Sequence, residues 1–145
     1  MSVGRICSRV IATASPSETI GAVARRMAEY DVGTILVVKG ERLSGAAGIV
    51  TDRDIAIRGV AGKLDPENTL VTQVMTTPVQ SVSEDTPVEE AVSRMASAGI
   101  RRLVVTGAGD RVAGILTLDD ALDLLIEEAA AMGRLLEKQK PRIPA

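Results

Sequence analysis

Apolar residues in this chain change their spacing in the same order twice. The two stripes with helical spacing are Ile20, Val23, Ala24 and Met27, and then Val88, Ala91, Val92 and Met95. Each stripe is followed by a run of aliphatic residues, at 35–38 after Thr34 and at 103–105. A spacing of i, i+3, i+4, i+7 predicts a helix with one buried face, and a short apolar run predicts a buried strand. The pattern therefore predicts two copies of one α+β unit.

The remaining elements of each unit lie on either side of these two. Turn residues at 39–44 and 107–110 follow the apolar runs, and each turn leads into a return strand that ends in a threonine. Short extended pieces at 10–13 and 79–82 precede the helices. Each unit is thus predicted to be β-α-β-β-α. In the second, Thr86, Pro87 and Glu89 predict an N-cap, a proline at the first helical position and a capping box.

A polar motif closes each return strand. Gly48 to Asp54 reads as a glycine, two aliphatic residues, a threonine, two variable residues and an aspartate, and the pattern recurs 66 residues later from Gly114 to Asp120. A threonine followed three residues later by an acid at a helix start is a capping box that needs no ligand. The same site, with free N–H groups and a helix dipole, can also attract a phosphate while the aspartate accepts hydrogen bonds from a sugar. The duplication favours the second interpretation.

Composition excludes several classes of function. The chain has 145 residues, a formal net charge of −2, a pI near 5.2, one tyrosine and no Phe or Trp. It therefore lacks the basic surface and stacking aromatics of a nucleic-acid binder, and no run is long enough to span a membrane. We expect a cytoplasmic protein, because the start of the chain lacks the apolar stretch of a signal peptide. The lone Cys7 is expected to be a small buried residue.

The residue types also argue against an enzyme. No histidine is present, Cys7 has no activating base, and the acidic residues form no evident metal-ligand cluster. The pairs Asp52–Asp54 and Asp119–Asp120 either hold magnesium beside a nucleotide or are solvated acids at helix starts, which is the commoner case. We expect no catalytic residues, no resident metal and no required cofactor.

The last segment departs from the repeat. The helical pattern runs on from Asp119 towards Gln139, with a heptad-like seam. The seam residues are Leu118, Leu122, Leu125, Ala129, Met132 and Leu136. They either pack on a partner subunit or fold back over the protein's own sheet, and Gly133 weakens any long coiled coil. We divide the chain into a first repeat at 1–62, a linker at 63–70, a second repeat at 71–126, and a helical extension with a tail at 127–145.

The repeated units resemble a tandem pair of CBS domains, also called a Bateman module. The resemblance covers the chain from about Val3 to Leu125, and the stretch TDRDIAIRGVAGKLDP at 51–66 is similar to stand-alone bacterial members. It implies two α+β repeats packed with pseudo-two-fold symmetry around two clefts. It also implies a regulatory module that binds an adenine-containing ligand: AMP, ADP or ATP, with NAD and S-adenosylmethionine as further candidates. A homodimer and an unidentified target protein are the partners expected.

Candidate ligand-binding residues follow from this resemblance. The motif aspartate would hold ribose hydroxyls and the motif threonine would lie near ribose or phosphate. These roles fall to the residues Thr51 and Asp54 in one cleft, and Thr117 and Asp120 in the other. In the family a basic couple opens the strand after the first helix and meets the phosphates, and Arg101 and Arg102 match it here.

Some assignments remain open at this point. The positions equivalent to the basic couple in the first repeat carry no charge, so Arg53 would have to compensate. The arginines of the couple either meet phosphate or form surface ion pairs. Thr13 and Ser81, in the first strands, either present backbone to adenine or are turn and cap residues. The alternative function is a ligand-free interaction and dimerisation module in which both motifs are only caps.

Overall fold

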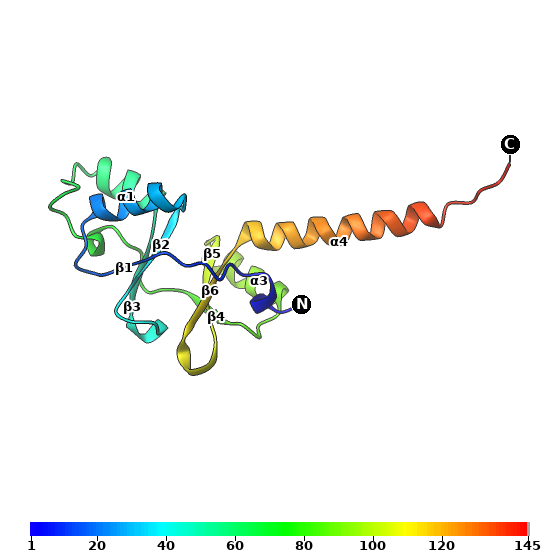
Figure 1. Ribbon diagram of the computed structural model, residues 1–145, viewed down its shortest axis with the longest axis horizontal. Helices are drawn as coiled ribbons and strands as arrows, with labels where there is room; N and C mark the ends of the chain where they lie inside the picture. The colour runs from blue at the N-terminus through cyan, green and yellow to red at the C-terminus, as the bar shows by residue number, and fades with distance from the viewer. Residues whose placement is uncertain (145) are drawn as a thin grey trace.

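The computed structural model describes residues 1–144 and shows two small lobes and one projecting helix (Figure 1). The first lobe contains β1 (Thr13–Ala14), α1 (Ile20–Tyr30), β2 (Thr34–Val38), β3 (Ala46–Thr51) and α2 (Asp52–Asp54), which continues as a π-helix over Ile55–Val60. The second contains β4 (Ser81–Ser83), α3 (Val88–Ala98), β5 (Arg102–Thr106), β6 (Val112–Thr117) and α4 (Leu118–Lys138). The predicted α+β fold with two repeats and a long last helix is confirmed.

Both sheets have the same topology. The strand orders are β1-β2-β3 and β4-β5-β6, and in each sheet the first pair is parallel and the second pair is an antiparallel hairpin. The middle strands are buried on both faces, as their continuous apolar runs predicted. The helical stripes are confirmed as well, since Val23 and Ala91 are fully buried in α1 and α3.

Two local predictions are wrong, and tertiary contacts explain both. The first strands begin at Thr13 and Ser81, because the residues before them cross from one sheet to the other. Helix α3 has no side-chain cap, and its N-cap is Pro87 rather than Thr86. The N-terminal segment occupies this helix start instead, where the carbonyl oxygen of Met1 accepts the Val88 N–H at 3.1 Å. A backbone partner from a distant segment thus replaces the predicted capping box.

The two repeats exchange their leading segments. Val3, in the 3-10 turn η1 (Val3–Arg5), is fully buried in the core of the second lobe, whereas Val71, in η4 (Val71–Gln73), is fully buried in the core of the first. The exchange is reciprocal, since Ser8 pairs with Ile115 of β6 and Thr76 pairs with Ile49 of β3. Such paired contacts are what the expected pseudo-two-fold arrangement requires. Neither lobe completes its core with its own sequence alone.

This exchange explains the glycine that opens each motif. A Cβ atom built on Gly48 would lie 2.5 Å from the sulfur of Met75 and 2.9 Å from the carbonyl oxygen of Thr76. One built on Gly114 would lie 2.6 Å from the carbonyl oxygen of Ser8. Contacts this short are sterically forbidden, so only glycine lets the crossing segment lie against the strand.

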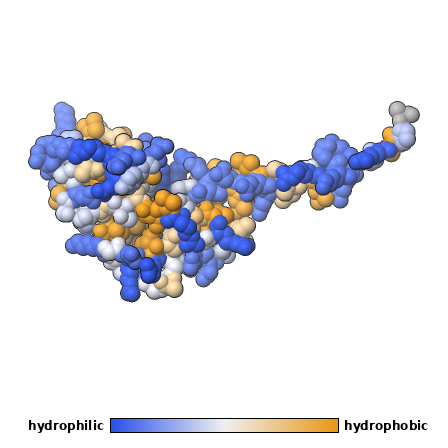
Figure 2. Space-filling view, viewed as in Figure 1, coloured by the Kyte–Doolittle hydropathy of each residue, from blue (hydrophilic) through white to orange (hydrophobic). Residues whose placement is uncertain are grey.

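Helix α4 leaves the body of the protein after its first turns (Figure 1). Ala121 is buried, and Leu118 and Leu124 pack at the edge of the second core. Beyond them the apolar side chains are exposed, including Leu125 at 60% and Leu136 at 65%. In Figure 2 apolar and polar patches alternate along the projecting helix. The alternative in which α4 folds back over its own sheet is therefore wrong.

Candidate functional site

Both motifs form the same hydrogen-bonded turn at the end of a strand. The Thr51 hydroxyl accepts the Asp54 N–H at 3.1 Å, and one carboxylate oxygen of Asp54, Oδ2, accepts the Thr51 N–H at 2.9 Å. In the second repeat the Thr117 hydroxyl accepts the Asp120 N–H at 3.2 Å, and Asp120 Oδ2 accepts the Thr117 N–H at 2.7 Å. The capping-box interpretation is thus confirmed for both motifs.

Capping does not use all of the Asp54 carboxylate. Its second oxygen, Oδ1, lies 4.0 Å from Arg58 Nε, and the side chain is 17% exposed. A carboxylate has about four acceptor positions, so Asp54 can cap the helix and still accept hydrogen bonds from a ligand. The structural role and a binding role are therefore compatible in the same side chain.

A cleft of about 210 Å³ brings parts of both repeats together. Its polar residues include Thr51 and Asp54 from the first motif, Arg102 at the start of β5 and Arg101 just before it. The other lining residues are Ile49, Thr76, Pro78, Val79, Gln80, Ile100 and Val104. The acidic motif of one repeat therefore faces the basic couple of the other, and the sequence alone could not assign this pairing.

The crossing segment 76–80 forms one wall of this cleft. Thr76 exchanges two backbone hydrogen bonds with Ile49, of 2.7 and 3.0 Å, which attach the segment to the first sheet. The Gln80 carbonyl oxygen accepts the Val104 N–H at 3.0 Å, which attaches its other end to the second sheet. Because both ends are held by strands, the wall is part of the scaffold of both sheets.

Arg58 was not among the residues predicted from the sequence, yet it contacts the chain where this wall begins. Its Nη1 atom donates to the carbonyl oxygens of Val74 and Met75, both at 3.0 Å, and approaches the Thr76 hydroxyl at 3.3 Å. Arg58 follows Asp54 by four residues, which places both side chains on one side of the helical turn. An arginine one helical turn after the motif aspartate was the available signal, but its targets are known only from the fold.

The two arginines of the cleft have no acidic partner within residues 1–144, where every ion pair involves other residues. The expected alternative, surface ion pairs at both positions, is therefore not observed. Arg101 is exposed and Arg102 is half-buried. Guanidinium groups without a carboxylate partner at the mouth of a cleft are suited to bind an anionic group, since their planar forks can donate two hydrogen bonds.

The other candidate residues lie elsewhere. Thr117 and Asp120 do not line the cleft of the arginines, although Thr117 pairs with Arg102 between β5 and β6. Arg53 is exposed and also lies outside that cleft. Thr13 lines a separate hollow of about 300 Å³, and Ser81 lines another of about 350 Å³ next to α3. The structure therefore brings together four of the nine candidates in one place.

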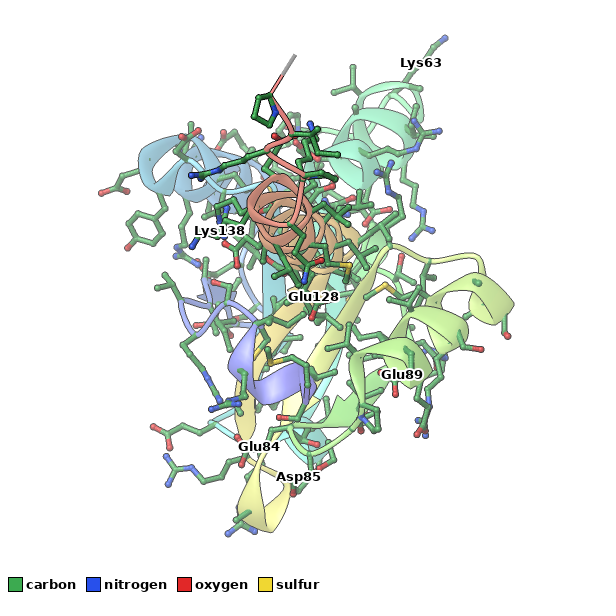
Figure 3. All side chains as sticks on the ribbon, turned by 90° about the vertical axis from the view of Figure 1, so that its right-hand side faces the viewer. Lys63, Glu84, Asp85, Glu89, Glu128 and Lys138 are labelled. Carbon is green, nitrogen blue, oxygen red and sulfur yellow. The ribbon has the colours of Figure 1, made fainter. Side chains whose placement is uncertain are left out.

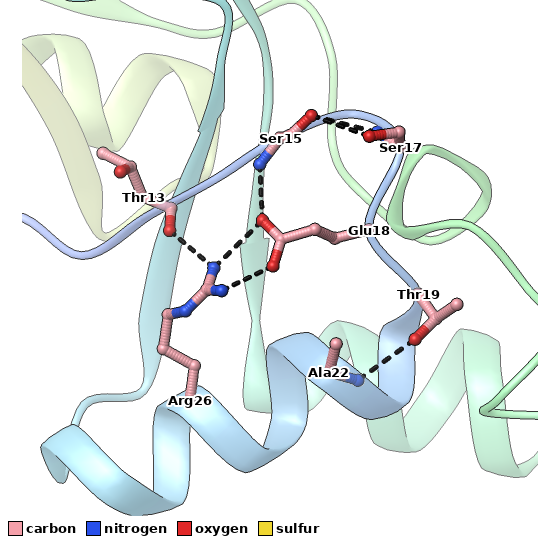
Figure 4. A network of polar contacts seen from close by, with 7 residues as sticks. All are labelled: Thr13, Ser15, Ser17, Glu18, Thr19, Ala22 and Arg26. Atoms are coloured by element: carbon pink, nitrogen blue, oxygen red, sulfur yellow. Dashed lines mark hydrogen bonds and ion pairs between the residues drawn. The ribbon is translucent and has the colours of Figure 1, made fainter.

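Thr13 is held by a polar network on α1 (Figure 4). Arg26 Nη1 donates to the Thr13 carbonyl oxygen at 2.8 Å and to a carboxylate oxygen of Glu18 at 3.1 Å. The second oxygen of Glu18 accepts from Arg26 Nη2, and the Ser15 N–H also donates to Glu18, at 2.7 Å. The hydrogen bond from Arg26 is the main cause that lowers the pKa of Glu18 below its usual value. This network fixes the start of the first strand, which is a structural role.

A larger hollow of about 570 Å³ lies at the tips of the two hairpins. It is lined by Lys39, Arg42 and Arg111, and Arg111 is paired with Glu41 at 2.7 Å. No motif residue reaches it, and its volume reflects the open space between exposed loops. The smaller cleft, where both repeats converge, is the better candidate site.

Other chemistry expected or excluded from the sequence can be located as well. Cys7 is buried in the second core, and its burial is the main cause that raises the pKa of the thiol. In the described part of the chain, no three His, Cys, Asp or Glu side chains are grouped so as to hold a metal ion. Among residues 1–144, no helix has the length and apolar character needed to cross a bilayer.

Comparison with known families agrees with this geometry. The family model described as "CBS domain" matches the chain twice, over residues 3–59 and 71–127. The chain belongs to the CBS domain family. Its two copies make it a tandem CBS pair, as the sequence predicted, and a CBS pair is a regulatory module.

Relatives with similar sequences support the assignment. The chain is 38% identical over 121 residues to the CBS domain-containing protein YhcV of Bacillus subtilis, covering 83% of each protein. It is 35% identical over 124 residues to an uncharacterized protein of Methanopyrus kandleri, covering 86% of this chain. It spans only 62% of the length of that M. kandleri protein, and 64% of a second B. subtilis relative.

Solved structures show the same fold. A protein with CBS domains from Burkholderia ambifaria is 26% identical, with a TM-score of 0.79 over 99% of this chain and 100% of that one. The CBS domain pair of protein MJ0100 is 25% identical, with a TM-score of 0.76 over 88% of this chain and 98% of that one. That pair was solved in complex with 5′-methylthioadenosine and S-adenosyl-L-methionine.

Proposed function

We propose that this CBS pair is a regulatory sensor that binds an adenine nucleotide in the cleft between Asp54 and the arginine couple. One observation carries the proposal: the carboxylate of Asp54 lines the same cleft as the guanidinium groups of Arg101 and Arg102, which have no acidic partner in the described residues. The adenosine ligands of the MJ0100 pair support a ligand with the same nucleoside part. AMP, ADP and ATP are the proposed ligands, and NAD and S-adenosylmethionine contain the same adenosine.

The cleft offers a suitable contact for each part of a nucleotide. Apolar side chains such as Ile49, Val79 and Val104 can contact the faces of the adenine ring. The Asp54 oxygen that the cap does not use, Oδ1, can accept hydrogen bonds from ribose hydroxyls, and the Thr51 hydroxyl belongs to the same turn. Arg101 and Arg102 then meet the phosphates, each charged hydrogen bond contributing about 1.5–3 kcal/mol.

The size of the cleft favours a ligand with its phosphates outside. At about 210 Å³ it is smaller than the roughly 300–1,000 Å³ typical of pockets that enclose a ligand. A nucleoside can fill it while charged phosphates remain near solvent beside the exposed Arg101. Burial of phosphate charge would otherwise carry a large desolvation cost.

We propose that the two clefts differ in affinity. The first repeat has Gly33 and Thr34 at the positions equivalent to the arginine couple, and pseudo-symmetry would set them towards a second cleft at Thr117 and Asp120. This second cleft has no matching cationic pair, so it would bind nucleoside without strong phosphate contacts. Arg53, which is exposed, is the residue proposed to compensate, and the ligand contacts of Thr13 and Ser81 remain proposals.

The decisive experiment is calorimetric titration of the intact protein with AMP, ADP, ATP, NAD and S-adenosylmethionine. It should be repeated on Asp54→Asn and on the matched control Asp120→Asn. Asparagine can still accept the threonine N–H, so both variants retain a capping bond. Loss of one charged hydrogen bond predicts about 10- to 150-fold weaker nucleotide binding for Asp54→Asn, with little change for Asp120→Asn at the phosphate-binding site.

A second variant tests the phosphate contacts. Replacing Arg101 and Arg102 together by alanine should weaken the binding of ATP more than the binding of adenosine, because adenosine has no phosphate group. The affinity of ATP for the wild type should also fall as salt concentration rises, since exposed charges are screened. Failure of every adenine compound to bind at millimolar concentration, or equal binding by wild type and Asp54→Asn, would overturn the proposal.

A ligand-free interaction module is the second candidate function, and the confirmed capping boxes together with the exposed apolar face of α4 favour it. It predicts that no nucleotide shifts the unfolding temperature, whereas a ligand at 100 times its dissociation constant should add about 2.7 kcal/mol. Under either function we propose a non-catalytic, cytoplasmic protein. The homodimer and the unidentified target protein also remain proposals.

A further inference from the structure

The apolar face of α4 has no partner within the described chain. Large side chains along it are exposed by 45% to 66%. They are Leu122, Leu125, Ile126, Met132, Leu135 and Leu136. The helix has 21 residues, and Figure 1 shows most of it standing clear of both lobes. A contiguous exposed apolar surface of this kind marks an interaction site.

The arrangement of these residues points to another helix as the partner. Leu122, Leu125, Ala129, Met132 and Leu136 alternate steps of three and four residues and so form one stripe. A lone helix of this length is marginally stable in water, and its stability normally comes from packing of its apolar face. A stripe of this width fits a single facing helix.

The charges of α4 are divided between its two ends. Residues 118–128 contain five acids and no base: Asp119, Asp120, Asp123, Glu127 and Glu128. The last turns of the helix, residues 134–138, contain two bases, Arg134 and Lys138, and one acid, Glu137, and two further bases, Lys140 and Arg142, follow the helix end. Figure 3 looks along α4 and labels Glu128 from its acidic half and Lys138 from its basic end. Two parallel copies would place like charges together, whereas two antiparallel copies would place each acidic end beside a basic end.

We propose that α4 pairs with α4 of a second copy of this chain in antiparallel orientation, with the two-fold axis near Ala130. This orientation also opposes the two helix dipoles favourably. At the centre of the pair lie Ala129, Ala130 and Ala131, whose small side chains allow close approach. The two globular bodies then lie at opposite ends of the helix pair, so they do not compete for the same space. The pairing does not depend on nucleotide binding.

Sedimentation equilibrium of the full chain tests whether the pair forms. The wild type should have about twice the monomer mass of 15.2 kDa. Combined Leu125→Glu and Leu136→Glu should return it to 15.2 kDa, because both residues lie in the stripe and are 60% and 65% exposed. Both side chains are outside the cores, so the circular dichroism of the lobes should persist.

A matched control identifies the surface. Ile57 is 56% exposed but lies on the π-helix of the first repeat, so Ile57→Glu should leave the dimer intact. A monomeric wild type would overturn the proposal. So would a dimer that persists in the α4 variant, or one that is dissociated by Ile57→Glu instead.

Spin-label distances test the orientation. In a Cys7→Ala background, labels at Lys138→Cys should lie about 24 Å apart along the axis of an antiparallel pair, given a rise of 1.5 Å per residue. A parallel pair would bring them to roughly 10 Å, the distance between packed helices. Labels at Ala130→Cys, near the proposed axis, should be close in both cases and confirm that the helices pair. A short distance at position 138 would overturn the antiparallel arrangement.

Discussion

Replacing Arg58 by alanine should destabilise the protein through the wall of the candidate cleft. Arg58 lies in the π-helix after the first motif, and one of its nitrogens contacts three oxygens of residues 74–76. Two of these oxygens are the carbonyl groups of Val74 and Met75, which directly precede the crossing segment 76–80. Without Arg58 these carbonyl groups would bond to water, and residues 74–76 would lose their attachment to the π-helix.

The expected loss of unfolding free energy depends on how exposed Arg58 is. A hydrogen bond to a charged group contributes about 1.5–3 kcal/mol. Because the side chain of Arg58 is 48% exposed, water screens it and can replace it in part, which favours the lower end, about 1.5 kcal/mol. For a chain of this length the unfolding temperature should fall by about 3–6 °C.

Arg94→Ala is the matched control. Arg94 pairs with Glu90 one turn earlier on α3, at 2.7 Å, and its side chain is 54% exposed. Such a pair on a helix surface contributes about 0.3–0.5 kcal/mol, so the unfolding temperature should change by roughly 1–2 °C. The two variants therefore remove arginines of similar exposure that differ in their acceptors.

Thermal and urea unfolding of both variants measure these differences. Hydrogen exchange at the Thr76 N–H gives a local measure, because this group bonds to Ile49 and should exchange faster only in Arg58→Ala. Equal destabilisation by the two substitutions, or unchanged exchange at Thr76, would show that Arg58 does not hold the wall.

Further predictions concern the core, the glycines and acid stability. Leu116→Ala should lower the unfolding free energy by about 2–5 kcal/mol in urea titrations, because Leu116 is fully buried. Gly48→Ala should lower the unfolding free energy by about 1–3 kcal/mol, because the new methyl group would displace the crossing segment. Gly133 has no neighbour within 4 Å, so Gly133→Ala should stabilise helix α4 by about 0.5–1 kcal/mol. Thermal scans should show a lower unfolding temperature for the first variant and a higher one for the second. Arg26 lowers the pKa of Glu18 in the folded protein, so their pairing stabilises the fold fully at pH values above 4.5, the usual pKa, and this stability is lost as the pH falls below that value. The unfolding free energy of Glu18→Gln should therefore depend less on pH in this range.

Local sequence patterns predicted the elements well. The stripes of α1 and α3, the hairpin strands and the long last helix were found because each depends on neighbours within a few residues. The caps at Thr51 and Thr117 were predictable for the same reason. The predicted capping box at Thr86 failed because a distant backbone group, the Met1 carbonyl oxygen, bonds at that helix start.

The candidate site could be predicted only residue by residue. Repetition and family resemblance singled out Asp54 and Arg102, yet no spacing in the sequence places them in one cleft. The spacing of Arg58 from Asp54 was a signal, but it could not identify the acceptors of Arg58, because these are backbone oxygens that any residue could supply.

The sequence by itself determined the two repeats, their secondary structure and the charge and apolar pattern of α4, since these depend on residue order and local hydrogen bonding. The tertiary structure alone decided that Val3 completes the second core and Val71 the first, because burial in a shared core is a long-range property. The same exchange carries the crossing segment between the sheets, and it thereby sets the carboxylate of one repeat opposite the arginines of the other.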